Sequence, residues 1–305
     1  GSGVRQLTVR YEPQTNARRV RVVYMTDDTG ETTYQTPRAD DPQDFRGKLD
    51  TAMKLLQCFT ADRMHEQGLG WSTFRLELDD DGRVVVHTLR GDHPASRYWA
   101  MDAGAWWGHV HDWVRRALPG PGAKYVVIAA YTRWDAAAQV ARGHTALGGG
   151  DLGLFGGGDL FAWPSSLGDV VRTFGDATRV DTTKVFDDSA GRSTHWALAS
   201  TTMGATLHEL GHALGLPHSR EPQDVMTRGF DHLGRAFLLT EAPARGAREP
   251  RPIAPEDEAV WHPISATLLG GSPWLALDEP PPPRHRAPEV RVEPARDGAR
   301  VAVEA

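Results

Sequence analysis

The sequence contains a single cysteine, Cys58, so no intrachain disulfide can form. Cys58 falls among apolar residues of an expected helix, which favours a buried structural thiol over a reactive or metal-bound one. A chain without disulfides fits a reducing compartment, but a large secreted domain can also do without them. The localisation of the protein therefore stays open.

Long apolar runs are absent as well. No stretch of 18 apolar residues is present to span a membrane, and no signal peptide is visible. Residues 1–3 read Gly-Ser-Gly, which is typical of a scar left by an expression tag, so a native leader could be missing. Basic runs are also lacking, and the formal net charge is −6, so nucleic acid is not an expected partner.

What is present is the balance of a soluble globular protein, with 40% hydrophobic and 24% charged residues. The length of 305 residues suffices for one large domain or two modest ones. Ten tryptophans favour a well-filled core or an aromatic-lined cleft, because this side chain is seldom placed where it cannot pack.

Hydrophobic periodicity predicts strands and helices in alternation. The expected elements are a strand over 20–25, a helix over 44–65, a hairpin over 74–87, a helix over 102–118 and a central strand over 125–131. In the second helix His109 and His111 lie two residues apart, so they point to different faces and cannot easily share a metal.

Two acidic stretches raise the question of calcium. Asp80-Asp81-Gly82 lies in the expected hairpin, but it lacks a ligand at every second residue, so turn chemistry is the better interpretation. Gly-Gly-Gly-Asp-Leu occurs at 148–152 and again at 156–160, which is too short a repeat for a calcium-binding roll. A mobile loop or an irregular edge strand is favoured there, and calcium is only weakly supported.

The strongest chemical signal begins at His208. His208 and His212 are four residues apart, so on a helix they project from one face and could bind one ion. Glu209 is rotated off that face, which favours a place beside the ion as a general base over a role as ligand.

A third histidine follows the end of this helix. Gly215 allows a left-handed turn, and Pro217 cannot continue a helix, so the chain would reverse and carry His218 back toward the metal. Three protein ligands leave a fourth position to water, which is typical of a catalytic zinc site. Two ordinary helix histidines are the alternative, but five fixed positions rarely match by chance.

The pattern His208-Glu209-x-x-His212-x-x-Gly215-x-x-His218 resembles the extended zinc motif of the metzincins. Those peptidases carry a methionine-containing turn beneath the metal, a place that Met226 in Asp-Val-Met-Thr fits. Some have a tyrosine ligand two residues further on, but here that residue is Arg228. The wider run over 181–232 is similar to a little-studied group of metzincin peptidases, some with a lectin-like domain after the peptidase.

The resemblance covers most of residues 15–278 and implies an α+β fold. We expect a twisted mixed sheet with two long helices, one of them the zinc helix, and a small lower subdomain. The predicted domains are a metzincin-like catalytic domain over 4–278, divided into upper 4–215 and lower 216–278, a proline-rich linker over 279–289, and a tail or the start of a further β domain over 290–305.

The predicted function is a zinc-dependent peptidase in which Glu209 is the general base, acting on a peptide or protein substrate. A zinc amidase for a non-peptide or narrow substrate, or a scaffold that only binds, remain alternatives. Metzincins bind peptide beside a sheet edge, for which the stretch over 144–163 is the candidate, with Leu147 and Leu152 as its test positions. His195 and His232 could line the cleft, although surface or core roles are favoured, and the oligomeric state is not predicted.

Overall fold

A five-stranded sheet forms the centre of the computed structural model, which describes residues 16–120, 122–276, 289–295 and 298–304. The strand order is β2-β1-β3-β7-β6, and all neighbours are parallel except β6, which runs antiparallel to β7 along one edge. These strands are β1 (Arg19–Thr26), β2 (Val86–Arg90), β3 (Ala123–Ala129), β6 (Ala146–Gly149) and β7 (Leu152–Gly156).

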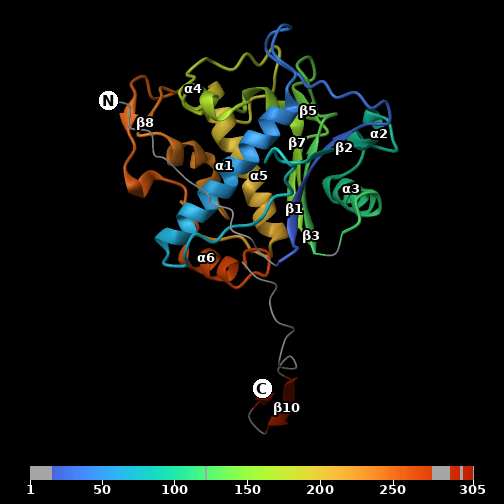
Figure 1. Cartoon of the computed structure of the whole chain (residues 1–305), viewed down its shortest axis with the longest axis vertical. Helices are drawn as coiled ribbons and strands as arrows, with labels where there is room; N and C mark the ends of the chain where they lie inside the picture. The colour runs from blue at the N-terminus through green and yellow to red at the C-terminus, as the bar shows by residue number, and fades with distance from the viewer. Residues whose placement is uncertain (1–15, 121, 277–288, 296–297, 305) are drawn as a thin grey trace.

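Helices cover both faces of the sheet (Figure 1). The helices α1 (Phe45–Glu66) and α5 (His195–Ala213) pack on one face, and α3 (Ala103–Ala117) packs on the other. Alternate residues of β1 therefore enter different cores: Val22 faces α1 and α5, whereas Val23 faces α3. Burial on both faces explains the near-continuous apolar runs of β1 and β3.

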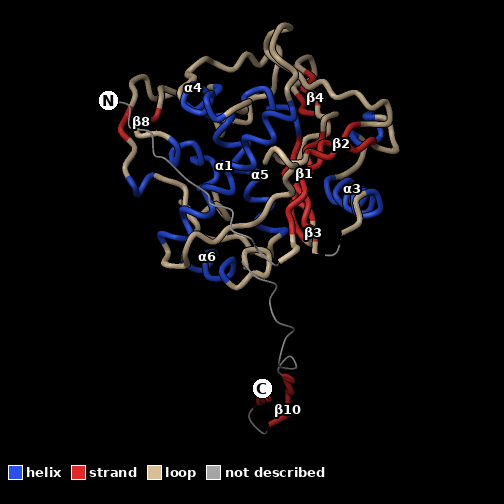
Figure 2. The backbone as a smooth tube through the Cα atoms, in the orientation of Figure 1, coloured by secondary structure: helices blue, strands red, loops and turns tan. Residues whose placement is uncertain are grey.

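The remaining elements are short and are joined by long loops (Figure 2). They are α2 (Ala95–Trp99), β4 (Arg133–Asp135), β5 (Val140–Arg142), η1 (Gly157–Ala162), η2 (Leu167–Asp169), α4 (Val170–Phe174), η3 (Gly229–Phe237), β8 (Thr240–Glu241), β9 (Arg251–Pro252), η4 (Pro255–Asp257), α6 (Pro263–Gly270), β10 (Glu289–Ala295) and β11 (Gly298–Glu304). Among the described residues, no helix is long and apolar enough to cross a membrane.

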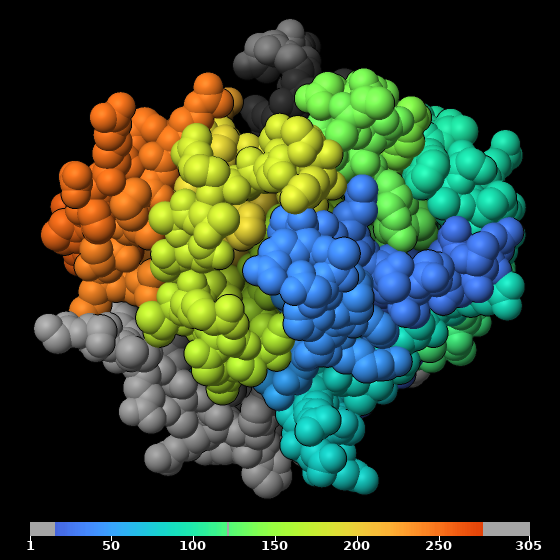
Figure 3. All heavy atoms as spheres, turned by 90° about the horizontal axis from the view of Figure 1, so that it is seen from above, coloured from blue at the N-terminus to red at the C-terminus, as the bar shows by residue number. Residues whose placement is uncertain are grey.

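Segments distant in sequence meet at the surface seen in Figure 3, where the region of α1 lies against the segment between β7 and α5. The buried ammonium of Lys48 in α1 makes this contact, because it donates to the backbone oxygens of Phe161 and Trp163. Burial lowers the pKa of Lys48 to about 8.

The expected α+β class, the two long helices and the central position of the strand predicted over 125–131 are confirmed. Leu78 and Val84 form an antiparallel bridge at the expected hairpin, and the Asp79 carboxylate accepts from two backbone N–H groups of its turn. Turn chemistry therefore accounts for the carboxylate of Asp79. The hairpin is short, because the chain continues from Val86 into β2 and pairs in parallel with β1.

The two glycine-rich repeats have different environments. Gly148 and Gly149 belong to the edge strand β6. Of the two interpretations of this stretch, a mobile loop or an irregular edge strand, the first copy of the repeat therefore fits the edge strand. The second copy is no mobile loop: Gly156 ends β7, and Gly157 and Gly158 begin η1 as buried residues. Cys58 is half-buried, and burial raises the pKa of its thiol to about 11, in keeping with a structural thiol.

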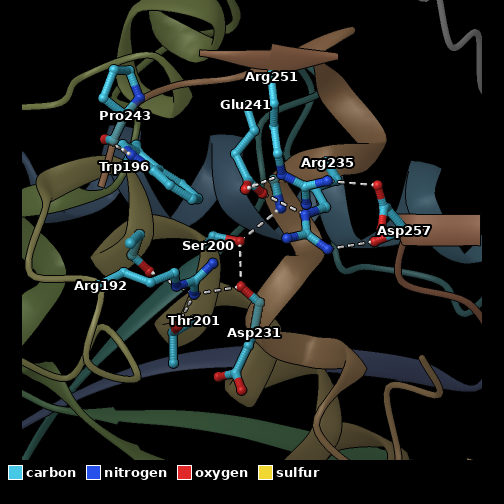
Figure 4. A network of polar contacts seen from close by, with 12 residues as sticks. Arg192, Trp196, Ser200, Thr201, Asp231, Arg235, Glu241, Pro243, Arg251 and Asp257 are labelled. Atoms are coloured by element: carbon cyan, nitrogen blue, oxygen red, sulfur yellow. Dashed lines mark hydrogen bonds and ion pairs between the residues drawn. The ribbon is translucent and has the colours of Figure 1, made fainter. Parts of the chain in front are cut away.

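The segment after Gly215 is tied to α5 by a polar network (Figure 4). The guanidinium of Arg192 donates to the backbone oxygen of Asp231 and to Thr201 in α5, and Ser200 donates to the same oxygen. Further out, Arg235 and Arg251 both pair with Glu241, which links η3 to β8 and β9. The network explains how irregular backbone is held against the helix that carries the histidines.

Near the C-terminus, β10 and β11 pair with each other as an antiparallel hairpin, with Val290 opposite Val303. The predicted linker over 279–289 lies outside the described residues, apart from Glu289. The domain boundaries stay a prediction.

Asp159 in η1 carries a buried carboxyl. Among the residues that the structure describes, neither of its carboxylate oxygens has a hydrogen-bond partner and no cation pairs with it. Burial and then the charges of Asp188 and Asp187 raise the pKa of Asp159 well above its ordinary value. Between the unfolded and folded pKa values, the folded chain keeps this proton whereas the unfolded chain releases it, so stability falls as the pH rises.

We therefore expect Asp159→Asn to stabilise the protein relative to the parent, and increasingly so as the pH rises above the ordinary carboxyl range. The parent loses stability from this group with rising pH, by at most about 1.4 kcal/mol per pH unit, whereas the neutral amide does not titrate. Melting temperatures across the pH range test this. Asp151→Asn is the matched control, because Asp151 holds the same place in the first repeat but pairs with Lys124. An advantage of Asp159→Asn that is independent of pH would contradict the interpretation.

Candidate metal centre

Helix α5 ends in a turn that brings a third histidine back to the first two. Gly215 has a φ of +99°, in the left-handed region that favours glycine. The N–H of Leu216 donates to the Gly211 oxygen and that of Gly215 to the His212 oxygen, which is a Schellman cap. The reversal predicted at Gly215 is therefore present.

The structure brings the three predicted histidines together. The Nε2 atom of His212 lies 3.1 Å from Nε2 of His208 and 3.1 Å from Nε2 of His218. His208 is buried, His212 is half-buried and His218 is exposed, so the cluster lies at the surface end of a buried helix.

The residues fit a zinc ion. His208 Nδ1 lies 2.7 Å from the Val225 oxygen and His212 Nδ1 lies 2.8 Å from the Leu216 oxygen, so a proton on each Nδ1 leaves Nε2 with a free lone pair. Burial lowers the pKa of His208 to about 4 and also lowers that of His212, which keeps both imidazoles neutral at pH 7. Tetrahedral zinc with Zn–N of about 2.0–2.1 Å needs nitrogen atoms about 3.3 Å apart, close to the spacing found.

Glu209 lies beside this cluster and is not part of it. Its side chain is only 6% exposed, and burial raises the pKa of its carboxyl to about 7, although a hydrogen bond from the Gly148 N–H lowers it. The N–H of a sheet-edge residue therefore orients the candidate base. The contact between Gly148 and Glu209 was not predicted from the sequence. The glycine repeat that begins at Gly148 was the sequence feature that could have indicated it.

Glycines allow the edge of the sheet to approach α5 at Glu209. A Cβ atom at Gly148 would lie 2.2 Å from the Glu209 backbone oxygen, and one at Gly153 would lie 2.9 Å from the Glu209 carbonyl carbon. Any larger residue would push the strands away from the helix. The glycines of 148–153 thus act through packing at the site.

Met226 lies under the end of α5 in a tight turn. Its side chain is fully buried, and a Cβ at Gly211 would lie 2.5 Å from its Sδ. The turn is closed by Asp224, whose side chain accepts from the Met226 N–H and whose backbone oxygen accepts from the Thr227 N–H. The arrangement agrees with a hydrophobic floor below the histidines.

Phe230, to which the sequence did not point, adjoins the histidine cluster. The ring of Phe230 meets His208 edge to face, with centroids 5.1 Å apart. Arg228, in the position where some metzincins have tyrosine, covers Phe230 and pairs with Asp231.

His195 and His232 do not join the three-histidine cluster. His195 begins α5 and pairs with Asp176 at 3.3 Å, roughly 20 Å along the helix from His208. It borders a hollow of about 420 Å³ that also includes Lys48. Burial lowers the pKa of His232 to about 4, so it is a neutral, largely buried residue.

The fold and the three convergent histidines define a candidate zinc peptidase, and the comparisons with known proteins support that class. Residues 2–302 match the model of a family described as "Putative peptidase family", and the chain belongs to that family. It is 33% identical over 255 residues to a "Putative zinc metalloproteinase" of Schizosaccharomyces pombe, and this match covers 77% of the chain. A protein of Saccharomyces cerevisiae with the same description is 30% identical over 268 residues, covering 76% of this chain. The matches span only 41% and 38% of the length of those relatives.

Among solved structures, the fold is similar to OgpA from Akkermansia muciniphila. A catalytically inactive form of OgpA, in complex with an O-glycopeptide substrate, matches with a TM-score of 0.56 at 18% identity, covering 94% of this chain and 69% of OgpA. The wild-type OgpA crystal structure matches with a TM-score of 0.55 at 19% identity, covering 94% of this chain and 70% of OgpA. Zinc agrees with the relatives and with the histidine cluster, whereas calcium finds no support.

Proposed function

We propose that the protein is a metzincin-type endopeptidase that hydrolyses peptide bonds with Glu209 as general base. The observation that carries the proposal is the convergence of three Nε2 atoms with a buried carboxylate beside them. His208, His212 and His218 would hold zinc, and Met226 would form the Met-turn below it.

Zinc held by the three histidines would polarise the scissile carbonyl and lower the pKa of an attacking water. Glu209 takes the proton from that water and returns it to the leaving amine. Its pKa of about 7 suits both transfers, because a base that is too weak does not accept the proton and one that is too strong does not release it. The N–H of Gly148 holds the carboxylate in place between the two steps.

An amidase for a narrow range of non-peptide substrates would use the same three histidines and Glu209. A scaffold that only binds its ligand would need neither Glu209 as a base nor the Gly148 N–H that orients it. A library of peptides, including peptides with O-glycosylated serine and threonine because OgpA binds an O-glycopeptide, separates these functions. Internal cleavage supports the endopeptidase, and no cleavage of any member would contradict it.

Chelation should abolish this cleavage, and zinc should restore it. Burial keeps His208 and His212 neutral at pH 7, so these two ligands bind the ion without having to lose a proton, and zinc should reload at that pH. Metal analysis and activity, measured on the same samples before chelation, after chelation and after zinc addition, check this. Activity that persists in metal-free protein would contradict the proposal.

The substrate would add as a strand beside β6. Of the predicted stretch over 144–163, only Ala146–Gly149 lies at the sheet edge, whereas Leu152 belongs to β7, pairs on both sides and is fully buried. Leu152 is therefore no test position for substrate contact. The N–H of Gly156 in β7 donates to the oxygen of Thr145. In an antiparallel pair every second residue bonds the partner strand, so Leu147 also bonds β7. The N–H of Ala146, between them, points away from β7 and toward the open side of the sheet edge.

We expect Ala146→Pro to raise KM severalfold and leave zinc content unchanged. Proline removes the outward N–H that a docked peptide would use but no bond of the β6–β7 pair. Ala146→Val keeps the N–H and serves as the control. Steady-state kinetics of both variants decide the matter: equal KM values would argue against docking at this edge.

A further inference from the structure

A second group of side chains that could bind a metal includes His109 of α3, the helix that packs on the face of the sheet opposite α5 (Figure 1). Asp92, His93 and His109 each place one donor atom within 4.8 Å of the other two. His109 Nε2 is 2.8 Å from Asp92 Oδ1, and the two imidazole rings stack with centroids 4.9 Å apart. Among the described residues, this cluster and the three-histidine cluster are the only such groups.

The backbone that carries two of these groups is held firmly. The N–H of Gly91 donates to the Thr26 oxygen and the N–H of Asp28 donates to the His93 oxygen, so the segment is fixed to the end of β1. A Cβ at Gly91 would lie 2.5 Å from the hydroxyl of Tyr98. The cluster therefore forms where a parallel strand ends, a usual place for ligand sites in open sheets.

Outer contacts orient the donor atoms. The hydroxyl of Tyr98 donates to Asp92 Oδ1 at 2.9 Å, and His93 Nδ1 lies 2.9 Å from the Asp92 backbone oxygen, which leaves Nε2 of His93 free. These contacts hold the Asp92 carboxylate and the His93 ring beside His109.

We propose that Asp92, His93 and His109 bind a second zinc ion, separate from the three-histidine site. Two imidazoles and one carboxylate form a donor set that zinc accepts. An ion there would join the end of β2 to α3. The alternative without metal is an Asp92–His109 ion pair on which the His93 ring stacks, and zinc titration distinguishes the two.

Zinc titration of chelator-treated protein by isothermal calorimetry tests this proposal. The parent should bind two equivalents of zinc, and His212→Ala, which weakens the three-histidine site, should keep the second. Adding His109→Ala to His212→Ala should weaken the remaining binding by at least about 10- to 100-fold, the range seen even when an outer partner of a ligand is removed.

His111→Ala in the same background is the matched control, since His111 lies two residues away on the same helix and stacks on Trp107 instead. His93→Ala gives an independent second ligand variant, and circular dichroism checks that each variant is folded. A single equivalent in the parent, or equal losses from His109→Ala and His111→Ala, would overturn the second site and leave the peptidase proposal untouched.

Discussion

Glu209→Gln should lower the rate of peptide hydrolysis by about 10²–10⁴-fold while the protein stays loaded with zinc. Glutamine keeps the size of the side chain and can still accept a hydrogen bond from Gly148, but it cannot take up a proton at neutral pH. Because Glu209 lies outside the three-ligand cluster, the metal site should be unaffected. Turnover and zinc content measured on the same preparation give both quantities.

His212→Ala is the counterpart, because it removes a ligand and not the base. Here both zinc affinity at this site and activity should be lost. The two variants therefore separate metal binding from proton transfer. If Glu209→Gln cleaves as fast as the parent, the assigned mechanism is wrong, whatever the metal content.

Gly148→Ala should lower kcat/KM on the order of 10²-fold, although the residue touches no metal ligand. Its new Cβ would lie 2.2 Å from the backbone oxygen of Glu209, so strand or helix must shift. A displacement of about 1 Å at a catalytic group is enough for a loss of this size. The shift also lengthens the hydrogen bond from the Gly148 N–H to the Glu209 carboxylate.

The neighbouring glycine provides a matched control. A Cβ at Gly149 would meet nothing within 4 Å, so Gly149→Ala should retain near-parental kcat/KM. Zinc content and melting temperature of both variants show whether a loss is local. Equal activity of Gly148→Ala and Gly149→Ala would refute the role given to the close approach.

Local sequence patterns predicted much of the structure for a physical reason. His208 and His212 share a face because of helical spacing, and the reversal at Gly215 needs a left-handed residue, so these features are visible in a single segment. The contact between Gly148 and Glu209 could not be foreseen, since it depends on how β6 packs on α5. The repeat glycines looked like loop residues because close packing and flexibility require the same residue type.

The outer partners of the histidines were also beyond prediction. Val225 and Leu216 act through their backbone oxygens, and any residue type supplies such an oxygen. Asp92 and His93 were not linked to His109 for a different reason. Their convergence depends on the register of β2 against β1, which the sequence does not show. Sequence reasoning did show that His109 and His111 face different ways, and their contacts agree.

The burial of α5 has a kinetic consequence for the metal. Nearly all of this helix is enclosed, so its amide protons should exchange with solvent only when the whole domain opens. His218, by contrast, is an exposed residue in the segment after the helix, which can open locally at far lower cost. Release of the ion should therefore begin with His218 swinging away from an otherwise rigid pair, and hydrogen exchange should be slow over residues 196–213 and fast around residue 218 on the same molecule.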